Sequence, residues 1–534
     1  MRLRLGLGAV CGLLACAIGL GAGELTAAWV RPEASPVVVV ANRFILLTPE
    51  WLKRLAIDWF ATDDKHALGT GIFAFLAVFA ALVGMRAARR GWEGLVGVAG
   101  FGAIGVYCAL TDHAARGTDV VPSIVAAVVA AVALTWLVAR IPVVDGILRP
   151  ATRDPATRDP ATRGPATRDP ATRDRAGGPG RRRFLMSGGA VAGAAAVTGF
   201  GGRAWQHRRF DAAESRATVV LPPARAPVPP LPAAADLAQD PTPFVTPNSS
   251  FYRIDTAYSV PQVVADTWRL RIHGLVERPL ELRLADLLAE PLIERYVTLA
   301  CVSNEVGGNL IGTALFRGTL LAPLLRRAGV DPTADQLVCR SVDGMTIGAP
   351  VAEVMDGRDA MLAVGMNGQP LPIAHGFPVR MVVPGLYGYV SACKWITEIE
   401  VSTYRAFSAY WVRQGWIQRA PIQLSSRIDT PSSGRRVSVG QTLTIAGVAW
   451  HQHVGIKAVQ VQVDDGPWLD ARLGSVPTTD TWRQWVTTWK VSGRGPHHIT
   501  VRGVDERGVV QSAQRRAPYP GASSGLHRIG ITAT

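Results

Sequence analysis

The stretch Val297–Thr319 reads VTLACVSNEVGGNLIGTALFRGT and places one cysteine, Cys301, at the end of an apolar run. The residues from Tyr296 to Ala300 are mostly apolar or β-branched and favour a strand. The polar, glycine-rich Ser303–Gly308 that follows is typical of a loop. The thiol therefore lies at a strand end, where it is either a small packing residue or a reactive group.

Several ordered motifs accompany this cysteine. Residues 312–318 read GTALFRG, residues 367–385 read NGQPLPIAHGFPVRMVVPG, and residues 393–395 read CKW. Together with TLACVSNEVGG, these motifs resemble the molybdopterin domain of the sulfite oxidase family over roughly residues 240–400, and more weakly to the C-terminus. The resemblance implies an α+β domain that binds molybdenum–molybdopterin.

The chemistry of such a cofactor agrees with these residue types. A thiolate is a soft ligand, and metal coordination keeps it deprotonated. The phosphate and polar rings of a pterin require fixed cations and hydrogen-bonding groups, and arginine and lysine suit phosphate. The alternative for His375 is a hydrogen-bonded loop histidine, and for Arg380 or Lys394 taken singly it is a solvated surface charge. The resemblance implies that Cys301 ligates the metal and that the pterin pocket contains Phe251, Arg253, Asp255, Asp343, His375, Arg380 and Lys394.

The substrate site departs from the family pattern. In eukaryotic sulfite oxidases a tyrosine and several arginines surround the oxyanion, because arginine forks suit tetrahedral anions. Here Ala409–Ile417 contains Arg413 but has Trp416 near the expected tyrosine, and the loop Gly388–Cys393 lacks the usual arginine. Tyr387, Tyr389 and Tyr410 are candidate proton donors. The catalytic candidates are Cys301, Arg253, Arg317, Tyr389 and Arg413.

Length and composition suggest several domains, including a membrane part. The chain has 534 residues, of which 48% are hydrophobic, and a formal net charge of +15. Its six cysteines form no disulfide framework. We interpret Cys339 and Cys393 as packing residues, while a bridge between them stays open.

Residues 1–140 contain four apolar stretches, at about 5–30, 69–85, 94–110 and 120–138, each close to the ~20 residues that cross a bilayer. The arginines at their ends fall on one side if the helices alternate, so the positive-inside rule places the N-terminus in the cytoplasm. A signal peptide is the rival interpretation of the first stretch.

Two further features border this four-helix membrane region. Pro49–Phe60 has the pattern of an amphipathic helix on the outer interface, or of an ordinary loop helix. His66 and His113 would suit a b-type haem or a quinone pocket, but interfacial histidines are commoner and we expect no haem there. The sequence has no Cys-x-x-Cys-His, so no c-type haem is attached to it.

Residues 141–180 contain repeats of Ala-Thr-Arg-Asp-Pro. Regular prolines prevent a continuous helix, and a lack of large apolar residues prevents a core, so we predict a disordered cytoplasmic linker. Aspartates offset most of its arginines, which argues against a nucleic-acid partner.

Residues 181–202 begin with Arg181–Met186, RRRFLM, and continue with alanines and glycines. This resembles a twin-arginine export signal that also forms a fifth membrane helix; an ordinary stop-transfer helix is the alternative, and cleavage stays open. The Pro/Ala-rich residues 203–240 predict an extended spacer outside the membrane.

The rest of the chain predicts two domains. Residues 241–420 mix strand-like runs such as Trp268–Gly274 with short helices at Leu284–Ala289 and Leu320–Arg326. Residues 421–534 contain about seven period-two strands separated by turns, typical of an immunoglobulin-like sandwich. In the sulfite oxidase family this position holds a dimerisation domain, which implies a homodimer; an adhesive or carbohydrate-binding module is the rival.

We predict a membrane-anchored molybdopterin oxidoreductase with an extracytoplasmic catalytic domain. It would transfer an oxygen atom to or from a small, sulfite-like oxyanion and exchange two electrons with a separate carrier, a cytochrome or a quinone. One alternative is an S-oxide reductase resembling the periplasmic methionine sulfoxide reductases, which lack the C-terminal sandwich. Another is a non-enzymatic, membrane-tethered binding protein.

Overall fold

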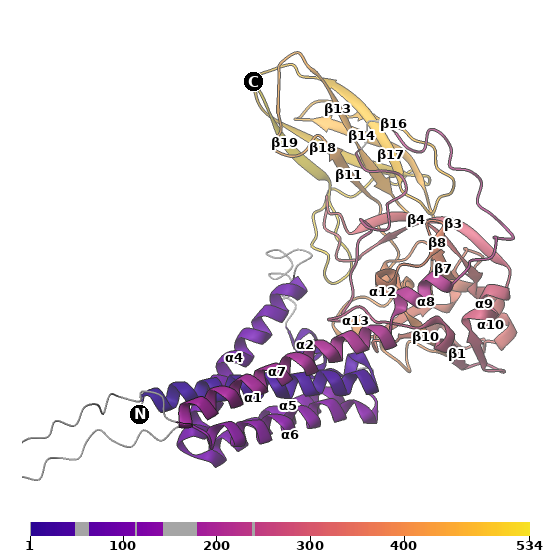
Figure 1. Cartoon of the computed structure of the whole chain (residues 1–534). Coiled ribbons are helices and arrows are strands. Elements are labelled where there is room, and N and C mark those ends of the chain that lie inside the picture. The colour runs from indigo at the N-terminus through magenta and orange to yellow at the C-terminus, as the bar shows by residue number, and fades with distance from the viewer. Residues whose placement is uncertain (1, 49–63, 113–114, 142–178, 238–240) are drawn as a thin grey trace, which may run out of the picture. The chain divides into compact units, whose positions relative to one another are not determined.

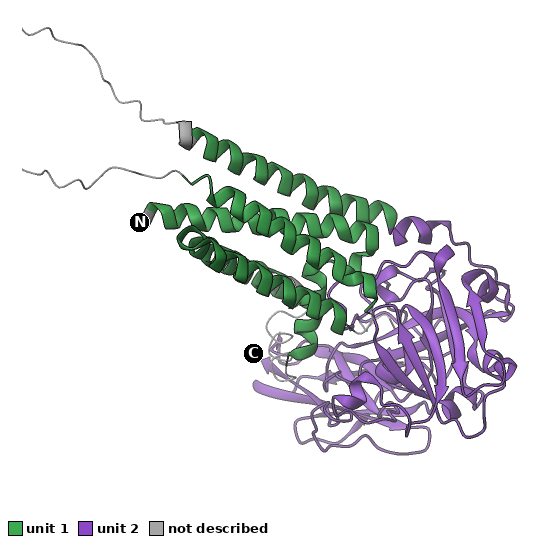
Figure 2. Ribbon diagram, turned by 90° about the horizontal axis from the view of Figure 1, so that it is seen from below, with its two compact units in different colours: residues 1–209 green, residues 210–534 purple. Residues whose placement is uncertain are grey.

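The computed structural model of the protein describes residues 2–48, 64–112, 115–141, 179–237 and 241–534. It divides into two compact units, Met1–Arg209 and Phe210–Thr534, which Figure 2 shows in different colours. The predicted amphipathic helix at 49–60, His113 and residues 142–178 of the predicted linker lie outside the described residues, as does the side chain of His66.

The first unit is a bundle of helices (Figure 1). Among the described residues, five helical segments are long and apolar enough to cross a membrane, by length and composition. The last of them, Arg182–Thr218, extends into the start of the second unit. The predicted apolar helices are confirmed. Its helices are α1 (Arg2–Val30), η1 (Pro32–Ala34), α2 (Pro36–Leu47), α4 (Asp64–Arg89), α5 (Gly91–Thr111), η3 (Gly117–Val120), α6 (Val121–Val138) and α7 (Pro179–Arg209).

Helix α2 was not predicted. It begins with Pro36 in its first turn, which suits a helix start, and continues with four valines. Its 12 residues are about 18 Å long, well short of a hydrocarbon core. A helix of this length falls below the ~20-residue apolar pattern by which membrane spans are recognised in a sequence.

Small residues let α1 pack closely against its neighbours. A Cβ added at Gly12 would lie 1.9 Å from the carbonyl oxygen of Ala80 in α4, and one at Gly8 would lie 2.7 Å from that of Gly84. Such close approach of backbones is how membrane helices associate. As the residue number increases along α1, the residue number of the contacted position in α4 decreases, so the two helices are antiparallel.

The same contacts decide which helix ends meet. Along α1, Gly19 and Gly23 approach Ala130 and Ala126 in turn, so α6 is also antiparallel to α1. Helix α7 is parallel to α1, because Gly188 lies near Leu14 and Gly202 near Leu25. The starts of α1 and α7 and the ends of α4 and α6 therefore gather at one end of the bundle. The basic residues at that end include Arg4, Arg86, Arg89, Arg140 and Arg182.

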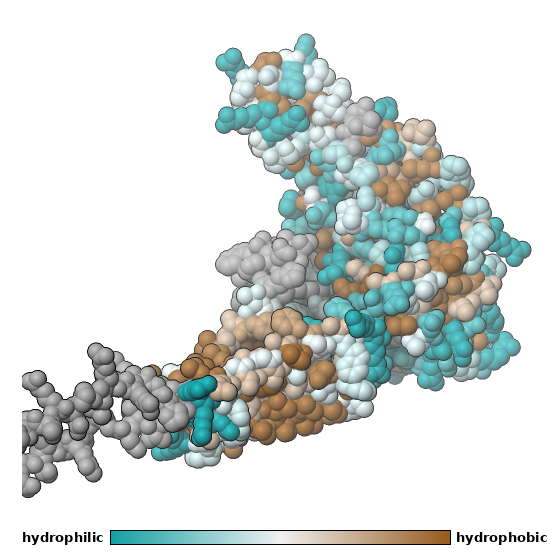
Figure 3. Space-filling model, viewed as in Figure 1, coloured by the Kyte–Doolittle hydropathy of each residue, from teal (hydrophilic) through white to brown (hydrophobic). Residues whose placement is uncertain are grey.

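The outer surface of the bundle is apolar. Phe75, Val78 and Phe200 are 64%, 62% and 76% exposed. Figure 3 shows apolar residues spread over the helices of this unit. A contiguous apolar surface of this kind suits contact with lipid.

The second unit begins with an α+β domain, as predicted. Its two sheets have the strand orders β2-β1-β10-β5-β6 and β3-β4-β7-β8, and β9 pairs with β7. The strands are β1 (Arg269–Gly274), β2 (Leu280–Arg283), β3 (Leu292–Ala300), β4 (Ile311–Leu320), β5 (Gln336–Ser341), β6 (Thr346–Pro350), β7 (Met361–Met366), β8 (Gln369–Pro370), β9 (Arg380–Val382) and β10 (Ile396–Ser402). The helices are α8 (Ala212–Thr218), η4 (Ala265–Thr267), α9 (Leu284–Ala289), α10 (Leu321–Ala328), α11 (Val351–Met355), η5 (Ile373–His375), α12 (Gly388–Ser391) and α13 (Tyr410–Arg413).

The antiparallel pair β3–β4 carries Cys301. Thr298 lies opposite Thr313, and Ala300 lies opposite Ile311, the last pair of the ladder. The backbone N–H of Cys301 then donates to the carbonyl oxygen of Leu310 at 2.9 Å and closes the loop between the strands. Cys301 is thus the first residue of a loop whose two ends are fixed by a regular ladder.

The C-terminal part of the second unit is a two-sheet sandwich, which confirms the predicted immunoglobulin-like fold. Its sheets have the orders β11-β13-β17-β16 and β12-β19-β18-β14-β15. Val448, Trp450 and Trp482 of this sandwich are buried in the same core as the α+β domain. The strands are β11 (Ser425–Thr430), β12 (Arg436–Val437), β13 (Thr442–Trp450), β14 (Ile456–Val463), β15 (Leu469–Asp470), β16 (Arg472–Leu473), β17 (Arg483–Lys490), β18 (Gly495–Asp505) and β19 (His527–Ala533).

Candidate functional site

Cys301 is a free, half-buried thiol at the end of β3. Burial raises its pKa, while hydrogen bonds from Ser303 and the positive charge of Lys394 oppose that rise. The thiol form is therefore favoured by the protein alone. A metal ion would reverse this preference, because a coordinating thiol loses its proton.

His375 ends the short helix η5 and is 6% exposed. Its Nε2 lies 3.1 Å from the carbonyl oxygen of Asn248, so Nε2 carries the proton and Nδ1 is left as an acceptor. Burial, and next the charge of Arg380, lower the pKa of His375 to about 4. Phe251 packs edge-on against the ring at 5.5 Å. The histidine is thus a fixed, neutral group at neutral pH.

Arg380 is the first residue of β9 and is 5% exposed. Its Nη1 donates to the carbonyl oxygen of His375 at 3.1 Å, whereas its Nε is buried without a partner among the described residues. Burial lowers the pKa of Arg380 to about 10, so the side chain stays charged at neutral pH. It is a buried cation with unused hydrogen-bonding capacity.

Lys394 and Asp255 form a buried ion pair. The Lys394 Nζ donates to Asp255 Oδ2 at 3.0 Å and to the carbonyl oxygen of Ile254 at 3.1 Å. Arg253 Nε lies 3.3 Å from the same Oδ2. Burial lowers the pKa of Lys394, and the Asp255 charge opposes that change. One carboxylate therefore serves two cations.

Asp343 lies in the turn between β5 and β6 and accepts a hydrogen bond from the backbone N–H of Met345 at 3.2 Å. Burial raises its pKa, which the hydrogen bond from Met345 and the charge of Lys394 counteract. Its interactions with Lys394 and Asp255 place it in the same cluster. The structure thus brings together the predicted cofactor residues Phe251, Arg253, Asp255, Cys301, Asp343, His375, Arg380 and Lys394.

Three of the catalytic candidates are engaged elsewhere. Arg317 on β4 binds Glu294 Oε1 through Nε and Nη2 and donates Nη1 to the carbonyl oxygen of Pro222. Arg413 is exposed and donates to the carbonyl oxygen of Ser408 at 2.7 Å. Tyr389 donates its hydroxyl to the carbonyl oxygen of Ile417 at 2.7 Å. These bonds are structural, and none of them involves Cys301.

Two tyrosines approach Cys301, and the sequence analysis selected only one of them. A Cβ at Gly388 would lie 3.7 Å from the Tyr252 hydroxyl and 3.6 Å from the carbonyl oxygen of Ala300, so that hydroxyl lies beside the end of β3. Burial and the neighbouring Cys301 raise the pKa of Tyr252, and burial raises the pKa of Tyr387 to about 12. Both hydroxyls stay protonated at neutral pH. Tyr252 lies in residues 251–255, FYRID, between Phe251 and Arg253, which were both predicted to line the pterin pocket.

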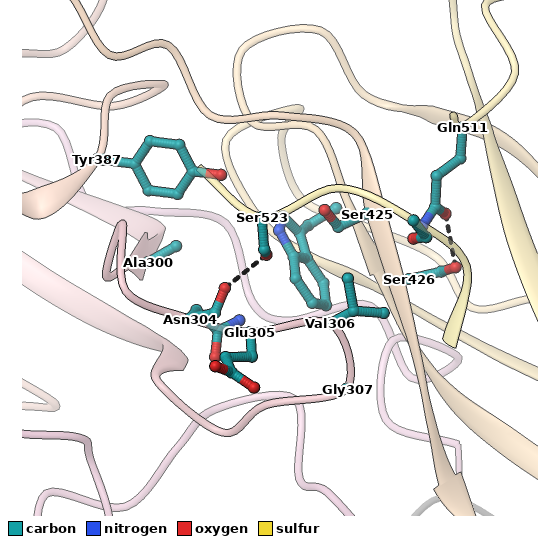
Figure 4. A pocket seen from close by; sticks show the side chains of 12 residues that line it. Ala300, Asn304, Glu305, Val306, Gly307, Tyr387, Ser425, Ser426, Gln511 and Ser523 are labelled. Carbon is teal, nitrogen blue, oxygen red and sulfur yellow. Dashed lines mark hydrogen bonds between the residues drawn. The ribbon is translucent and has the colours of Figure 1, made fainter. Parts of the chain in front are cut away.

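The C-terminal sandwich also reaches the thiol loop, which the sequence analysis missed. A small cavity beside β3 is lined by Ala300, Asn304 and Tyr387 from the α+β domain and by Ser426, Gln511 and Ser523 from the sandwich (Figure 4). It is a different space from the His375–Arg380–Lys394 cluster. Asn304 of the thiol loop and Ser426 of the sandwich both line it although they lie 122 positions apart in the sequence, a distance at which sequence patterns give no signal.

The donor set fits a pterin-bound metal. Among the described residues, no group of three or more His, Cys, Asp or Glu side chains is placed to hold a metal ion. A metal held by one thiolate and by the sulfurs of its own cofactor needs no such group. The unpartnered buried Nε of Arg380 offers an anion its charge-assisted hydrogen bond. Cys339 and Cys393 are both free thiols, so the bridge left open by the sequence is absent from this structure.

Residues 257–411 match the family described as oxidoreductase molybdopterin binding domain, and residues 425–501 match the bacterial Ig domain family. The mitochondrial sulfite oxidase of Homo sapiens is 32% identical over 318 residues, which cover 50% of this chain and 57% of that protein. The sulfite oxidase of Gallus gallus is 32% identical over 320 residues, 50% of this chain and 68% of that protein.

Among solved structures, the sulfane dehydrogenase SoxCD from Paracoccus pantotrophus aligns with 53% of this chain and 80% of its own at 26% identity, with a TM-score of 0.47. The chain spans little more than half the length of the human relative that it matches.

Burial makes His375 an acid-sensitive point of the second unit. The unfolded chain takes up a proton there near pH 6.5 and the folded chain near about 4, so stability is lost as the pH falls through this window. At pH 4.5 the loss is on the order of 2 to 3 kcal/mol. We expect His375→Gln to remove this part of the difference between denaturant unfolding curves at pH 7.5 and pH 4.5. An unchanged difference in the variant would contradict this.

Proposed function

Because the chain belongs to the sulfite oxidase family of molybdopterin-dependent oxidoreductases, we propose that its second unit transfers an oxygen atom to or from a small, sulfite-like oxyanion. The observation that carries this proposal is the gathering of buried cations and a free thiol at the end of β3. The enzyme class follows from the family, whereas the substrate and the direction of transfer are proposed.

Each residue has a distinct part in this proposal. Bound molybdenum–molybdopterin supplies two-electron redox chemistry and oxygen exchange. Cys301 provides the thiolate ligand, and Arg380 donates to an anionic part of the pterin through its spare N–H groups. His375, neutral and fixed by Asn248, presents Nδ1 as an acceptor. The Tyr252 hydroxyl, whose pKa is raised by burial and by Cys301, holds a proton near the reacting centre.

Arg253 is the candidate for the substrate oxyanion. Its side chain is 36% exposed and shares Asp255 with Lys394, so it connects the buried cluster to solvent. Arg317 and Arg413, the other anion candidates, are bound to Glu294 and to the carbonyl oxygen of Ser408. This shortage of available cations favours a second candidate, a neutral S-oxide, whose oxygen needs a hydrogen-bond donor rather than a charge.

The surroundings of the enzyme form a further part of the proposal. Electrons pass to a separate carrier, a cytochrome or a quinone. The basic ends of α1, α4, α6 and α7 face the cytoplasm, and α7 carries the twin-arginine signal, so the second unit lies outside the membrane. The sandwich mediates a homodimer, which the molar mass of the detergent-solubilised full chain would test.

The metal is the first quantity to measure. We expect the full chain, purified from a host that makes the cofactor, to contain about one molybdenum atom per chain. Cys301→Ser should change the metal spectra and abolish activity, because a hydroxyl is a poor substitute for a soft thiolate. Cys339→Ala is the matched control, since this buried thiol contacts Met381 Sδ at 3.6 Å and lies in the core. Absence of molybdenum from well-folded material would contradict the proposal.

The two substrate classes separate at Arg253. If an oxyanion is the substrate, Arg253→Met should raise its KM at least about tenfold, since a charge-assisted hydrogen bond is lost. If a neutral S-oxide is the substrate, the change should stay within about threefold. Rates with sulfite and with an alkyl sulfoxide, normalised to molybdenum content, make the comparison. Arg405→Met, at an exposed arginine of the same domain, is the control.

Export should depend on the paired arginines that begin α7. Replacing Arg181 and Arg182 by lysines should leave Phe210–Thr534 on the cytoplasmic side, because the twin-arginine route requires the pair. Protease added to intact spheroplasts would then leave this unit uncut. The same replacement at Arg208 and Arg209, at the other end of α7, is the control. Normal export of the first variant would show an ordinary stop-transfer helix instead.

A further inference from the structure

The C-terminal sandwich holds β3 three residues before Cys301. The backbone N–H of Thr298 donates to the carbonyl oxygen of Asp480 at 2.9 Å. The carbonyl oxygen of Thr298 accepts from Gln452 Nε2 at 3.2 Å, and its hydroxyl oxygen accepts from the backbone N–H of Trp482 at 2.7 Å. One residue of β3 thus makes three hydrogen bonds to the sandwich.

The sandwich also holds the loop after Cys301. The Ser523 hydroxyl donates to the carbonyl oxygen of Asn304 at 2.6 Å, as Figure 4 shows. Arg427 Nη1 donates to the carbonyl oxygen of Gly308 at 2.9 Å. Between these contacts, a Cβ at Gly307 would lie 2.5 Å from the ring of His527. The sandwich therefore contacts the loop at Asn304, Gly307 and Gly308, which lie three, six and seven residues after Cys301.

The donors themselves are fixed. Ser523 is 8% exposed, and the Arg427 side chain is 10% exposed and paired with Asp429. The backbone N–H of Ile428 donates to His527 Nδ1 at 3.0 Å, which orients that ring toward Gly307. Buried donors with fixed partners position an acceptor more firmly than solvent-exposed ones.

The loop needs such support. Gly307 has a φ of +84°, and its neighbour Gly308 adds a second residue without a side chain, so the segment has wide conformational freedom when unsupported. Besides the Cys301–Leu310 bond that closes it, the loop has three cross-links of its own: the N–H of Asn304 donates to the carbonyl oxygen of Cys301 at 3.1 Å, Asn304 Oδ1 accepts from the N–H of Leu310 at 2.8 Å, and the N–H of Gly308 donates to the carbonyl oxygen of Glu305. The hydrogen bonds from Ser523 to Asn304 and from Arg427 to Gly308 come from the sandwich, so the α+β domain by itself does not supply them.

We propose that Ser523 and Arg427 of the C-terminal sandwich are positioning residues that hold the Cys301 loop in the geometry that metal ligation requires. The sandwich then serves the active site within one chain, whether or not it also mediates a dimer. The inference rests on the proposed function for its meaning, since the thiol matters as a metal ligand. Small displacements of a ligand or reacting group change rates strongly, which is why supporting residues of this kind affect activity.

The test compares two adjacent serines in the full chain. Ser523 and Ser524 each donate a 2.6 Å hydrogen bond to a carbonyl oxygen, but Ser523 reaches Asn304 while Ser524 reaches Gln514 of its own domain. Arg427→Gln is paired in the same way with Arg502→Gln, because Arg502 binds Gln460 and stacks on Trp468 within the sandwich. Ser523→Thr, which keeps the hydroxyl, tests rescue.

The first readout is alkylation of Cys301 by iodoacetamide in cofactor-free protein, followed by mass spectrometry of the peptide. We expect Ser523→Ala and Arg427→Gln to raise the rate about fivefold or more, because each loses a buried hydrogen bond that resists loop opening. The Ser524 and Arg502 variants should match the wild type. The second readout, in metal-loaded protein, is the Mo(V) electron paramagnetic resonance spectrum, which should change together with kcat while KM stays within about twofold.

Equal alkylation rates for Ser523→Ala and Ser524→Ala, with unchanged spectra, would overturn the inference and leave the contacts as domain packing. If Ser523→Ala fails to fold, Arg427→Gln against Arg502→Gln decides the same question. A chain that holds no molybdenum but still shows the difference in alkylation would refute the proposed function and keep the positioning role. The two failures are therefore distinguishable.

Discussion

Burial of positive charge beside Cys301 is the constraint on which the site depends. Taking an arginine or lysine out of water costs several kcal/mol unless a counter-charge or hydrogen bonds replace the lost hydration. Lys394 has its counter-charge in Asp255, which the fold itself supplies. Arg380 has only the carbonyl oxygen of His375, and its buried Nε has no partner among the described residues. The charge of Lys394 is therefore balanced within the protein, whereas Arg380 still has N–H groups that can donate. An anionic ligand that reaches Arg380 would form its strongest hydrogen bonds there. A pterin phosphate has the chemistry to do so.

As the metal ligand that we propose, Cys301 would require a rigid support on both sides of the thiol. The β3–β4 ladder supplies one side, since its register ends with Ala300 opposite Ile311 and leaves Cys301 at the start of the loop. The sandwich supplies the other side through Ser523 and Arg427. The shared core of the two domains makes this support stiff, because close-packed interiors transmit displacement rather than absorb it. The packing of the sandwich against the α+β domain therefore also affects the position of Cys301.

Local patterns explain which features were predictable from the sequence. The strand before Cys301, the apolar helices and the alternating strands of the sandwich are all encoded by residues close together in the chain. The residues predicted to form a pterin pocket came from ordered motifs; they lie close together in the structure, and their role stays a prediction. The cross-strand pair Glu294–Arg317 could not be predicted, because the register of β3 and β4 depends on the length of the loop between them. The contacts of Ser523 and Arg427 with the thiol loop join residues more than 100 positions apart, for which a single sequence offers no pattern.

The charges of the cluster affect whether a charged or a neutral substrate binds more readily. Arg253, Arg380 and Lys394 are cationic, while Asp255 and Asp343 are carboxylates, and burial raises the pKa of Asp343. A metal-bound Cys301 adds a thiolate, and a pterin adds its phosphate. Arg253 is the partly exposed cation of this cluster, so under the proposed function an oxyanion would be held where water screens its charge. A neutral S-oxide meets no such difficulty, since the protonated hydroxyls of Tyr252 and Tyr387 supply donors without adding charge. Under the proposed function, Arg253, whose side chain is 36% exposed beside Asp255, is therefore the residue whose replacement separates oxyanion from S-oxide chemistry.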